Sequence, residues 1–407
     1  MKILQSSRVS EVHGTMATDL NSDDNVLVQN INEYKGRGLF ALRDFRKGET
    51  LFREKPIVSC QFSWNRVYGY KCCHHCLEPL ETANENVVRL ANDPNIVLPN
   101  HECCSTRQSF HCKCPNCDCW FCSKNCQEEA WNSYHKVLCH NDPNHPLAIL
   151  DEIWRPMHYP PETSSIGLVI RILATIVQAQ DPEEQIGILM SLMHDTVNKK
   201  EQLAHKMLGE RFADQLEQLR MACTTAFASY PVVQSFLSPD GFAAIFALIG
   251  RNSQGIGTSS FAVWTKKVEK LATKPNEKSQ LEKLIDTVYD AIEQNAGSFL
   301  NNEGSGLYAK QSTINHSCDP NAEVEFPFNN HELVVNASKN ISAGEEILIS
   351  YLECCDLERS RHSRSKMLSE NYLFLCDCMK CQSQMGDPDV TSDEEMSSEE
   401  ASEDDDE

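Results

Sequence analysis

Two groups of cysteine and histidine residues have the spacing of metal ligands. The first reads Cys-x2-Cys, Cys-x2-Cys, Cys-x3-Cys and His-x3-Cys, and a two-residue spacer lets both thiolates of a turn reach one Zn²⁺ at about 2.3 Å. Eight ligands make two four-ligand sites. Alternating pairs, as in cross-braced zinc modules, predict one site from Cys73, Cys76, Cys122 and Cys126, and the other from Cys114, Cys117, His135 and Cys139.

Both sites have a full set of protein ligands, so we expect them to be structural rather than catalytic. We expect His135 and Cys139, at i and i+4, to lie on one face of a helix. Other thiols lie close by in the sequence and could replace a ligand or form a further site: Cys72, Cys103, Cys104, Cys112 and Cys119.

The second group is CDCMKC, with Cys376, Cys378 and Cys381. Three thiolates leave a tetrahedral zinc one ligand short, and nothing usable follows residue 381. The natural fourth ligand is Cys318 in INHSCDPN, ahead of the competing pair Cys354 and Cys355. Zinc would then tie the C-terminal segment to the turn around residue 318.

Metal explains the 20 cysteines better than disulfides do. The first residues lack the apolar stretch of a secretory signal, and no run of 18 apolar residues indicates a membrane span. We therefore expect a soluble intracellular protein, cytoplasmic, nuclear or both, and without membrane contact. Reducing compartments do not maintain disulfides.

The formal net charge is −22, and residues 386–407 contribute twelve acidic and no basic side chains. We interpret that tail as a solvated, disordered end, with docking of a basic protein as the alternative. Residues 61–140 carry seven basic and eight acidic side chains. Zinc fingers that read DNA are usually basic, so direct nucleic-acid binding is not expected.

The elements that must position these ligands alternate between β and helical patterns. Short β-rich runs at 26–31, 38–42 and 50–60 are separated by turns at 35–38 and 46–49. Helical periodicity starts near residue 163 and continues through helices with Ser238 as N-cap and an apolar stripe from Leu281 to Ile292. Strands are expected again at 306–315, 322–326, 331–341 and 345–352. The cysteine-rich segment at 72–140 shows little periodicity, so metal is expected to replace a core there.

This order of motifs resembles the SMYD family of protein lysine methyltransferases. The matching motifs are GRGLFA (36–41), the eight-ligand pattern, NHSCDPN (315–321), GEEILISY (344–351) and CDCMKC (376–381). The resemblance covers residues from about 26 to 385 and implies an α+β fold, a SET-domain β-fold that is split by a zinc-binding MYND module and a helical insert. An acidic tail stands where most relatives carry a C-terminal helical domain, so their substrate preferences do not transfer.

The implied domains follow the chain in order. They are an N-terminal segment (1–25), the first part of the SET domain (26–71), the MYND-type module (72–140), the helical insert (141–300), the C-terminal SET core (301–352), a post-SET zinc segment (353–385) and a disordered acidic tail (386–407).

The resemblance also implies roles for single residues. Beside S-adenosylmethionine it places the turn Lys35, Gly36, Arg37 and Gly38, together with Asn252, Asn315, His316, Tyr351 and Phe374. Without the other motifs, residues 35–38 read as a plain hairpin turn and Asn252 as a helix C-cap. His316 as a catalytic base ranks below its binding role.

Tyr351 matches the SET catalytic tyrosine, at the end of the GEEILISY strand. Tyr372 and Phe374 would line the lysine channel, with ordinary aromatic core as the alternative. The basic run 359–366 reads as the solvated face of a helix, and contact with the acidic tail or a nuclear address are alternatives.

The expected function is methyl transfer from S-adenosylmethionine to a lysine of a basic protein, such as a histone or a ribosomal protein, by a monomer with three structural Zn²⁺ ions. The alternative is a catalytically weak adaptor whose MYND module binds peptide partners. The sequence fixes neither the substrate nor the number of methyl groups added.

Overall fold

The computed structural model describes residues 25–32, 35–154, 165–198, 203–204, 212–297 and 299–390. The expected N-terminal segment up to residue 24 and most of the acidic tail, residues 391–407, lie outside the described residues. Among the described residues, no single helix meets the length and hydropathy needed to cross a membrane. One bent pair, Pro231–Leu237 with Pro239–Asn252, passes by length and composition alone.

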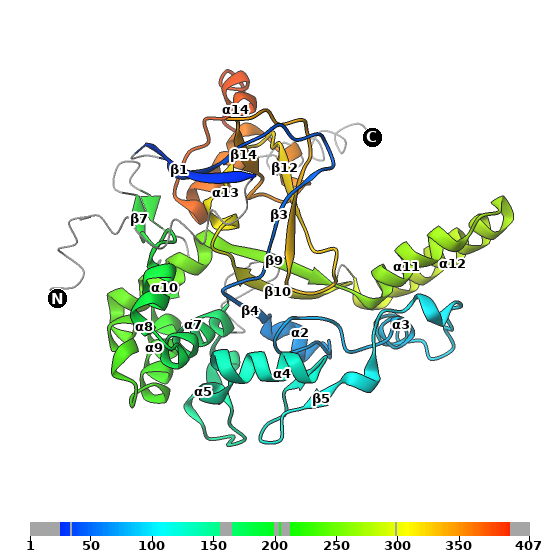
Figure 1. The fold of residues 1–407 in the computed structure, drawn as a ribbon, viewed down its shortest axis with the longest axis horizontal. Coiled ribbons are helices and arrows are strands. Elements are labelled where there is room, and N and C mark those ends of the chain that lie inside the picture. Colours follow the sequence, from blue (N-terminus) through cyan, green and yellow to red (C-terminus); the bar gives the residue numbers. More distant parts are fainter. Residues whose placement is uncertain are drawn as a thin grey trace, which may run out of the picture.

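Three sheets of three or four strands form the main β part of the described residues (Figure 1), besides two short two-stranded sheets. The first has the order β1 (Val26–Asn32), β2 (Gly36–Ala41), β14 (Glu346–Ile349) and β11 (Asn315–His316). The second has the order β12 (Ala322–Glu325), β13 (Leu333–Ala337) and β3 (Thr50–Glu54). Each of these two sheets therefore combines strands from both ends of the chain, as predicted for two halves of one β domain.

These two sheets share one apolar core. Alternate residues of the strands point into it, as a half-buried strand requires, and the most buried members include Leu39, Leu333, Val335 and Ile347. The pair β11–β14 is parallel, with Asn315 opposite Leu348 and His316 opposite Ile349. Residues 315 and 316 thus sit on a sheet edge fixed by the core behind them.

The third sheet corrects the expectation that residues 141–300 are a helical insert throughout. It pairs β4 (Val58–Gln61) with β10 (Asn302–Leu307) and β10 with β9 (Ser253–Thr258). Strand β9 lies inside the expected insert and runs antiparallel to β10 over its whole length. The insert therefore returns to the β framework before the last two of its helices begin.

Helices pack against this third sheet in one block, seen at the lower left of Figure 1. Its members are α6 (Leu150–Trp154), α7 (Ile166–Gln178), α8 (Pro182–Met190), α9 (Ala213–Ala226) and α10 (Pro239–Asn252). The predicted cap of α10 is confirmed, because the Ser238 side chain accepts a hydrogen bond from Gly241 N and Pro239 follows it. Helix α7 is buried nearly all round and contacts both β4 and the cysteine-rich segment.

The cysteine-rich segment is not held by metal ligands alone, contrary to the expectation for residues 72–140. Helix α3 (Ala83–Ala91), with a complete capping box at Thr82 and Glu85, packs against α11 (Ser260–Leu271) and α12 (Pro275–Ala296). A separate apolar cluster, which includes Val87, Cys103 and Trp264, joins them. Figure 1 shows α11 and α12 extending together from the body of the molecule.

The strand expected at 306–315 ends early. Strand β10 stops at Leu307, and a 3₁₀ turn at Gln311–Thr313 precedes β11. The carboxylate of Glu54 accepts hydrogen bonds from Lys310 N at 2.8 Å and Gln311 N at 2.9 Å. This distant carboxylate satisfies the N–H groups at the start of the turn, where both residues are buried, so the chain can leave the strand there.

Candidate active site and zinc centres

The first two ligand groups assemble as the alternating pairs predict. In each set of four the ligand atoms lie within 4.8 Å of one another. In one set Cys122 Sγ lies 3.6 Å from Cys76 Sγ and 3.5 Å from Cys126 Sγ. In the other, His135 Nε2 lies 3.4 Å from Cys114 Sγ. A tetrahedron with zinc–sulfur bonds of about 2.3 Å places its sulfurs roughly 3.8 Å apart, so both donor sets fit Zn²⁺.

Short local elements present these ligands. The hairpin of β5 (Cys112–Lys113) and β6 (Trp120–Phe121) carries one pair, and helix α4 (Lys124–Ala130), capped by Ser123, carries Cys126. His135 ends a π-helical turn at Trp131–His135, which is followed by α5 (Lys136–Leu138). Cys139 lies beyond that helix in extended backbone, so the expected pair on one helical face is wrong in detail.

The third group joins Cys318 to Cys376, Cys378 and Cys381, with all four sulfurs within 4.8 Å of one another. Cys318 Sγ lies 3.5 Å from Cys381 Sγ and 3.9 Å from Cys376 Sγ, which again suits a tetrahedral Zn²⁺. The competing residues Cys354 and Cys355 are exposed and belong to none of the ligand groups among the described residues. Cys119 alone of the other nearby thiols joins a group, with His74 and His135.

Three aromatic side chains, Tyr351, Tyr372 and Phe374, meet beside this third group. The ring of Tyr351 lies 4.8 Å from that of Tyr372 and 6.2 Å from that of Phe374, edge-on to the latter. Tyr351 Oη donates a hydrogen bond of 2.7 Å to Ile314 O, and Tyr372 Oη donates one of 3.2 Å to Tyr351 O. Burial raises the pKa of Tyr351, and it raises the pKa of Tyr372 to about 12. Both hydroxyls are therefore protonated at neutral pH. Strand β14 ends at Ile349, so Tyr351 lies just past the strand that was expected to end with it.

His316 uses both ring nitrogens within the protein. Its Nδ1 accepts a hydrogen bond from Tyr351 N at 3.0 Å, and its Nε2 lies 3.3 Å from Cys318 Sγ. Burial lowers its pKa to about 4, so the imidazole is neutral at neutral pH. A neutral ring with both nitrogens engaged is poorly placed to act as a general base.

The GRG motif belongs to a strand, not to the hairpin turn that residues 35–38 alone predict. Gly36 has a φ of +66° at the start of β2, a conformation that favours glycine. A Cβ on Gly38 would lie 2.9 Å from Glu346 Oε1 and 2.6 Å from Ile31 Cδ1. The missing side chain leaves room for Glu346, whose Oε1 accepts a 2.8 Å hydrogen bond from Asn315 Nδ2.

Three further residues of the expected cofactor pocket have identified partners. Asn315 Nδ2 also donates to Arg37 O at 2.9 Å, which joins β11 to β2. Lys35 Nζ lies 3.1 Å from Oδ1 of Asp377, which follows Cys376 and precedes Cys378 in the sequence. Asn252, the last residue of α10, donates to Met193 O and Leu248 O, both at 2.7 Å. The structure thus brings residues 35–38, 315–318, 351 and 372–381 together.

Sequence reasoning missed one residue at this site. Arg364 in α13 (Arg361–Tyr372) lies within the basic run expected to face solvent, yet it is fully buried. Its Nη2 lies 3.6 Å from Cys381 Sγ. The predicted helix is present, and the rest of the run supports the alternative contact with the tail, because Arg361 Nη2 pairs with Asp389 at 2.7 Å.

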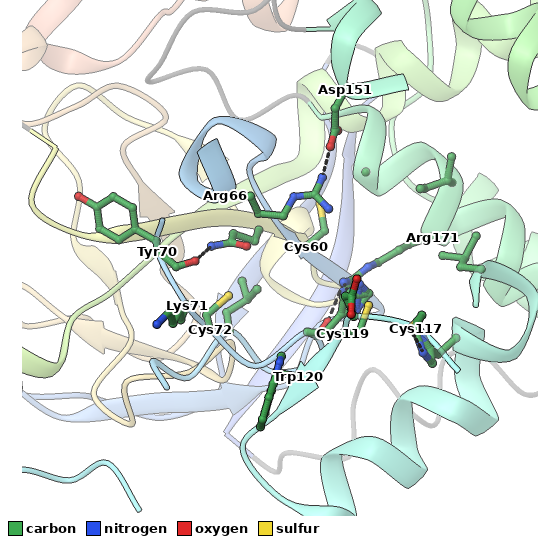
Figure 2. Close-up of a pocket in the computed structure, with 18 of the residues that line it drawn as sticks. Cys60, Arg66, Tyr70, Lys71, Cys72, Cys117, Cys119, Trp120, Asp151 and Arg171 are labelled. Atoms are coloured by element: carbon green, nitrogen blue, oxygen red, sulfur yellow. Dashed lines mark hydrogen bonds and ion pairs between the residues drawn. The ribbon is translucent and has the colours of Figure 1, made fainter. Parts of the chain in front are cut away.

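A cavity of about 730 Å³ opens elsewhere, between the ligand set that contains Cys117 and His135, strand β4 and helix α7 (Figure 2). Arg66 pairs with Asp151 across it, and Arg171 Nη2 donates to His74 O at 2.6 Å. Tyr351 and Tyr372 are not among its lining residues. The chemistry expected at the tyrosines therefore lies outside this cavity.

Comparison with known proteins matches the SET domain model to residues 175–352. Protein-lysine N-trimethyltransferase SMYD5 of Gallus gallus is 51% identical over 373 residues, which cover 91% of this chain and 89% of that protein. The protein of the same name from Homo sapiens is 49% identical over the same shares. Histone-lysine N-methyltransferase SMYD3 of Mus musculus is 44% identical over 94 residues, or 23% of this chain and 21% of that protein. The long gap between Cys76 and Cys114 and the acidic tail favour this same fifth member among SMYD proteins.

Proposed function

The chain belongs to the SMYD5 family of SET-domain protein-lysine methyltransferases, and we propose that it transfers methyl groups from S-adenosylmethionine to a lysine of a basic protein. The observation that carries this function to particular residues is the meeting of Tyr351, Tyr372 and Phe374 beside Asn315 and His316. Trimethylation, which the names of the two SMYD5 relatives specify, is the product that we propose here.

S-adenosylmethionine supplies an electrophilic methyl group when bound. The protein then has to hold a neutral lysine amine in line with that methyl and to exclude water, so positioning is the main source of rate. The rings of Tyr351, Tyr372 and Phe374 form an apolar channel, which lowers the pKa of an entering lysine and frees its lone pair. The protonated hydroxyl of Tyr351 orients the amine and accepts weak C–H···O contacts.

The cofactor-binding residues follow from the contacts of β2 and β11. Backbone at Gly36 and Gly38 allows close approach, and Asn315 and His316 fix the facing edge. The ammonium of Lys35 lies at the same place, on a side chain that is 37% exposed and forms an ion pair with Asp377. This ammonium suits the cofactor carboxylate. Asn252 and Phe374 complete the set that we assign to the cofactor, with Arg37 contributing its carbonyl to Asn315.

The proposed domains keep the expected order with two changes. The MYND-type module at 72–140 includes the helix α3, and the insert at 141–300 includes strand β9. Residues 26–71 and 301–352 form the split SET core, and 353–385 form the post-SET segment. Each of the three ligand groups holds one structural Zn²⁺, because every set offers four donors and leaves no open position.

The net charge of −22 suits a basic substrate such as a histone or a ribosomal protein. We place the protein in the cytoplasm, the nucleus or both, as a monomer, with peptide partners for the MYND-type module and no direct nucleic-acid contact. The adaptor alternative predicts no stabilisation by the cofactor. A thermal shift at saturating S-adenosylmethionine therefore separates an enzyme from an adaptor.

The decisive experiment compares wild type with Tyr351→Phe on cell extract and labelled cofactor, followed by peptide mass spectrometry. Tyr289→Phe is the matched control, because that tyrosine packs against the apolar cluster of Val87, Cys103 and Trp264, away from the site. We expect labelled trimethyl-lysine with wild type and with the control, and at most about 1% of that rate with Tyr351→Phe. Full transfer by Tyr351→Phe would remove the assignment of Tyr351.

A further inference from the structure

Arg364 is a buried cation with no carboxylate partner among the described residues. Its guanidinium is fully buried in α13, and its three identified hydrogen-bond partners are Arg359 O at 2.5 Å, Gln384 Oε1 at 2.6 Å and Cys381 Sγ at 3.6 Å. A buried charge without a counter-charge costs several kcal/mol. The anion that offsets it must therefore come from the cysteine group itself.

Binding of zinc creates that anion, because the four cysteines bind the metal as thiolates. Four thiolates around one Zn²⁺ carry a net charge of −2, whereas four protonated thiols carry none. A guanidinium at hydrogen-bond distance from one ligand offsets part of this charge and stabilises the thiolate form. Arginine suits such a place better than lysine does, because it remains charged when buried and donates several hydrogen bonds in fixed directions.

The same guanidinium joins three pieces of chain. Arg359 precedes α13, Arg364 lies in it, and Cys381 and Gln384 lie in and just after α14 (Met379–Ser383). Helix α13 ends at Tyr372, whose hydroxyl donates to Tyr351 O. A contact that holds α13 against the zinc ligands therefore also sets the position of Tyr372 in the lysine channel.

We propose that Arg364 is a positioning residue of the third zinc site: it compensates the tetrathiolate charge, slows zinc release and holds α13, and thereby Tyr372, at the active site. This inference rests on the proposed zinc centre at Cys318, Cys376, Cys378 and Cys381. It assigns a function to a buried residue of the basic run at 359–366, whose composition alone predicts exposure to solvent.

The test measures zinc content and the rate of zinc release to a chromogenic chelator, for the full chain loaded with metal. Arg364→Met removes the charge and keeps most of the volume, Arg364→Lys keeps the charge, and Lys366→Gln removes an exposed charge from the same helix. Outer-shell partners of metal sites typically change metal affinity 10–100-fold. We expect release from one of the three sites to accelerate at least about 10-fold in Arg364→Met, to accelerate less in Arg364→Lys, and to stay within about threefold of wild type in Lys366→Gln.

A second readout follows the ligands directly. With ¹¹³Cd in place of zinc, we expect the resonance of one tetrathiolate site to shift in Arg364→Met and to stay near its wild-type position in Lys366→Gln. We also expect kcat of Arg364→Met to fall while KM for the cofactor changes less. Should Arg364→Met fail to fold, the lysine variant decides alone, since a charge-compensating role requires it to retain its third zinc.

The outcomes separate this inference from the function on which it depends. Three zinc ions in wild type with an unchanged release rate and ¹¹³Cd spectrum in Arg364→Met would overturn the role of Arg364 and leave the methyltransferase intact. Equal zinc loss in the methionine and lysine variants would overturn charge compensation. Two zinc ions in fully active wild type would overturn the third site itself and the inference with it.

Discussion

Replacing Cys318 with serine should detach the C-terminal segment from the β core without unfolding that core. In residues 373–385 only Leu373 and Cys381 are buried, while Met379 is 77% and Met385 is 71% exposed. Burying one leucine contributes about 1.5–3 kcal/mol, and ordering backbone costs about 1–2 kcal/mol per residue. Apolar burial alone is therefore far too small to order the segment.

A structural zinc ion can supply the free energy that ordering this segment requires, since its apparent binding free energy is about 10–16 kcal/mol. Loss of one thiolate of the four should release the ion and the segment that depends on it. We expect zinc content to fall from three ions to two, amide-exchange protection to disappear in residues 373–385, and kcat to fall at least about 100-fold because Tyr372 and Phe374 lose their positions.

The assay combines metal analysis with hydrogen exchange followed by mass spectrometry. Protection in β13 and β3 should persist, because their core does not depend on the third site. Cys355→Ser is the matched control, since that thiol is exposed and belongs to no ligand group in the described chain. Three zinc ions and unchanged protection in Cys318→Ser would refute the reasoning, as would zinc loss in Cys355→Ser.

Three other predictions address the channel and the cores. The ratio kcat/KM should rise from pH 7 to pH 10 as the substrate lysine, with a pKa of about 10.4, loses its proton. Burial raises the pKa of Tyr351 and brings that of Tyr372 to about 12, so neither hydroxyl should ionise in this range. A decrease of kcat/KM in this range that disappears in Tyr351→Phe would contradict the role proposed for the protonated Tyr351 hydroxyl. Gly304→Ala places a Cβ 2.2 Å from Cys60 O and should lower the melting temperature in calorimetry, whereas Gly257→Ala on the neighbouring strand meets nothing nearer than 4.0 Å and should not. Trp264→Ala should cost about 3–5 kcal/mol in denaturant unfolding while zinc content stays at three ions, since this buried indole donates to Pro99 O away from every ligand group.

The ligand groups were accessible from the sequence because most of their ligands come in locally spaced pairs, and Cys318 followed because CDCMKC lacks a fourth donor. A pair such as Cys114 and Cys117 spans one turn, and only the pairing of turns needed an outside rule. The family of the chain was also accessible, since five motifs in fixed order are specific together. Helix α10 was predicted with its cap because Ser238 and Pro239 act within one turn.

Features that depend on distant partners were not accessible. The end of β10 is set by the carboxylate of Glu54, more than 250 residues earlier in the chain. The α3 cluster could not be found from residues 77–113, because its other half, including Trp264, comes from α11 and α12. The composition of the run placed Arg364 in solvent with its charged neighbours, since nothing in the helix itself shows that the thiol of Cys381 lies beside it.

The third zinc centre is the point where these distant parts become one site. The neutral His316 ring connects two of these parts, because its Nε2 donates to the ligand Cys318 and its Nδ1 accepts from Tyr351 N. Tyr372 then donates to Tyr351 O. The ion pair of Lys35 with Asp377 also bridges the cofactor strand and the zinc segment, but its side chains are 37% and 61% exposed. Such pairs contribute about 0–1 kcal/mol. The metal that we propose for the third group, and not this pair, must therefore hold Tyr372 and Phe374 in position. Exchange of Asp377 for the cofactor carboxylate, the role that we propose for Lys35, would therefore leave the C-terminal segment in place.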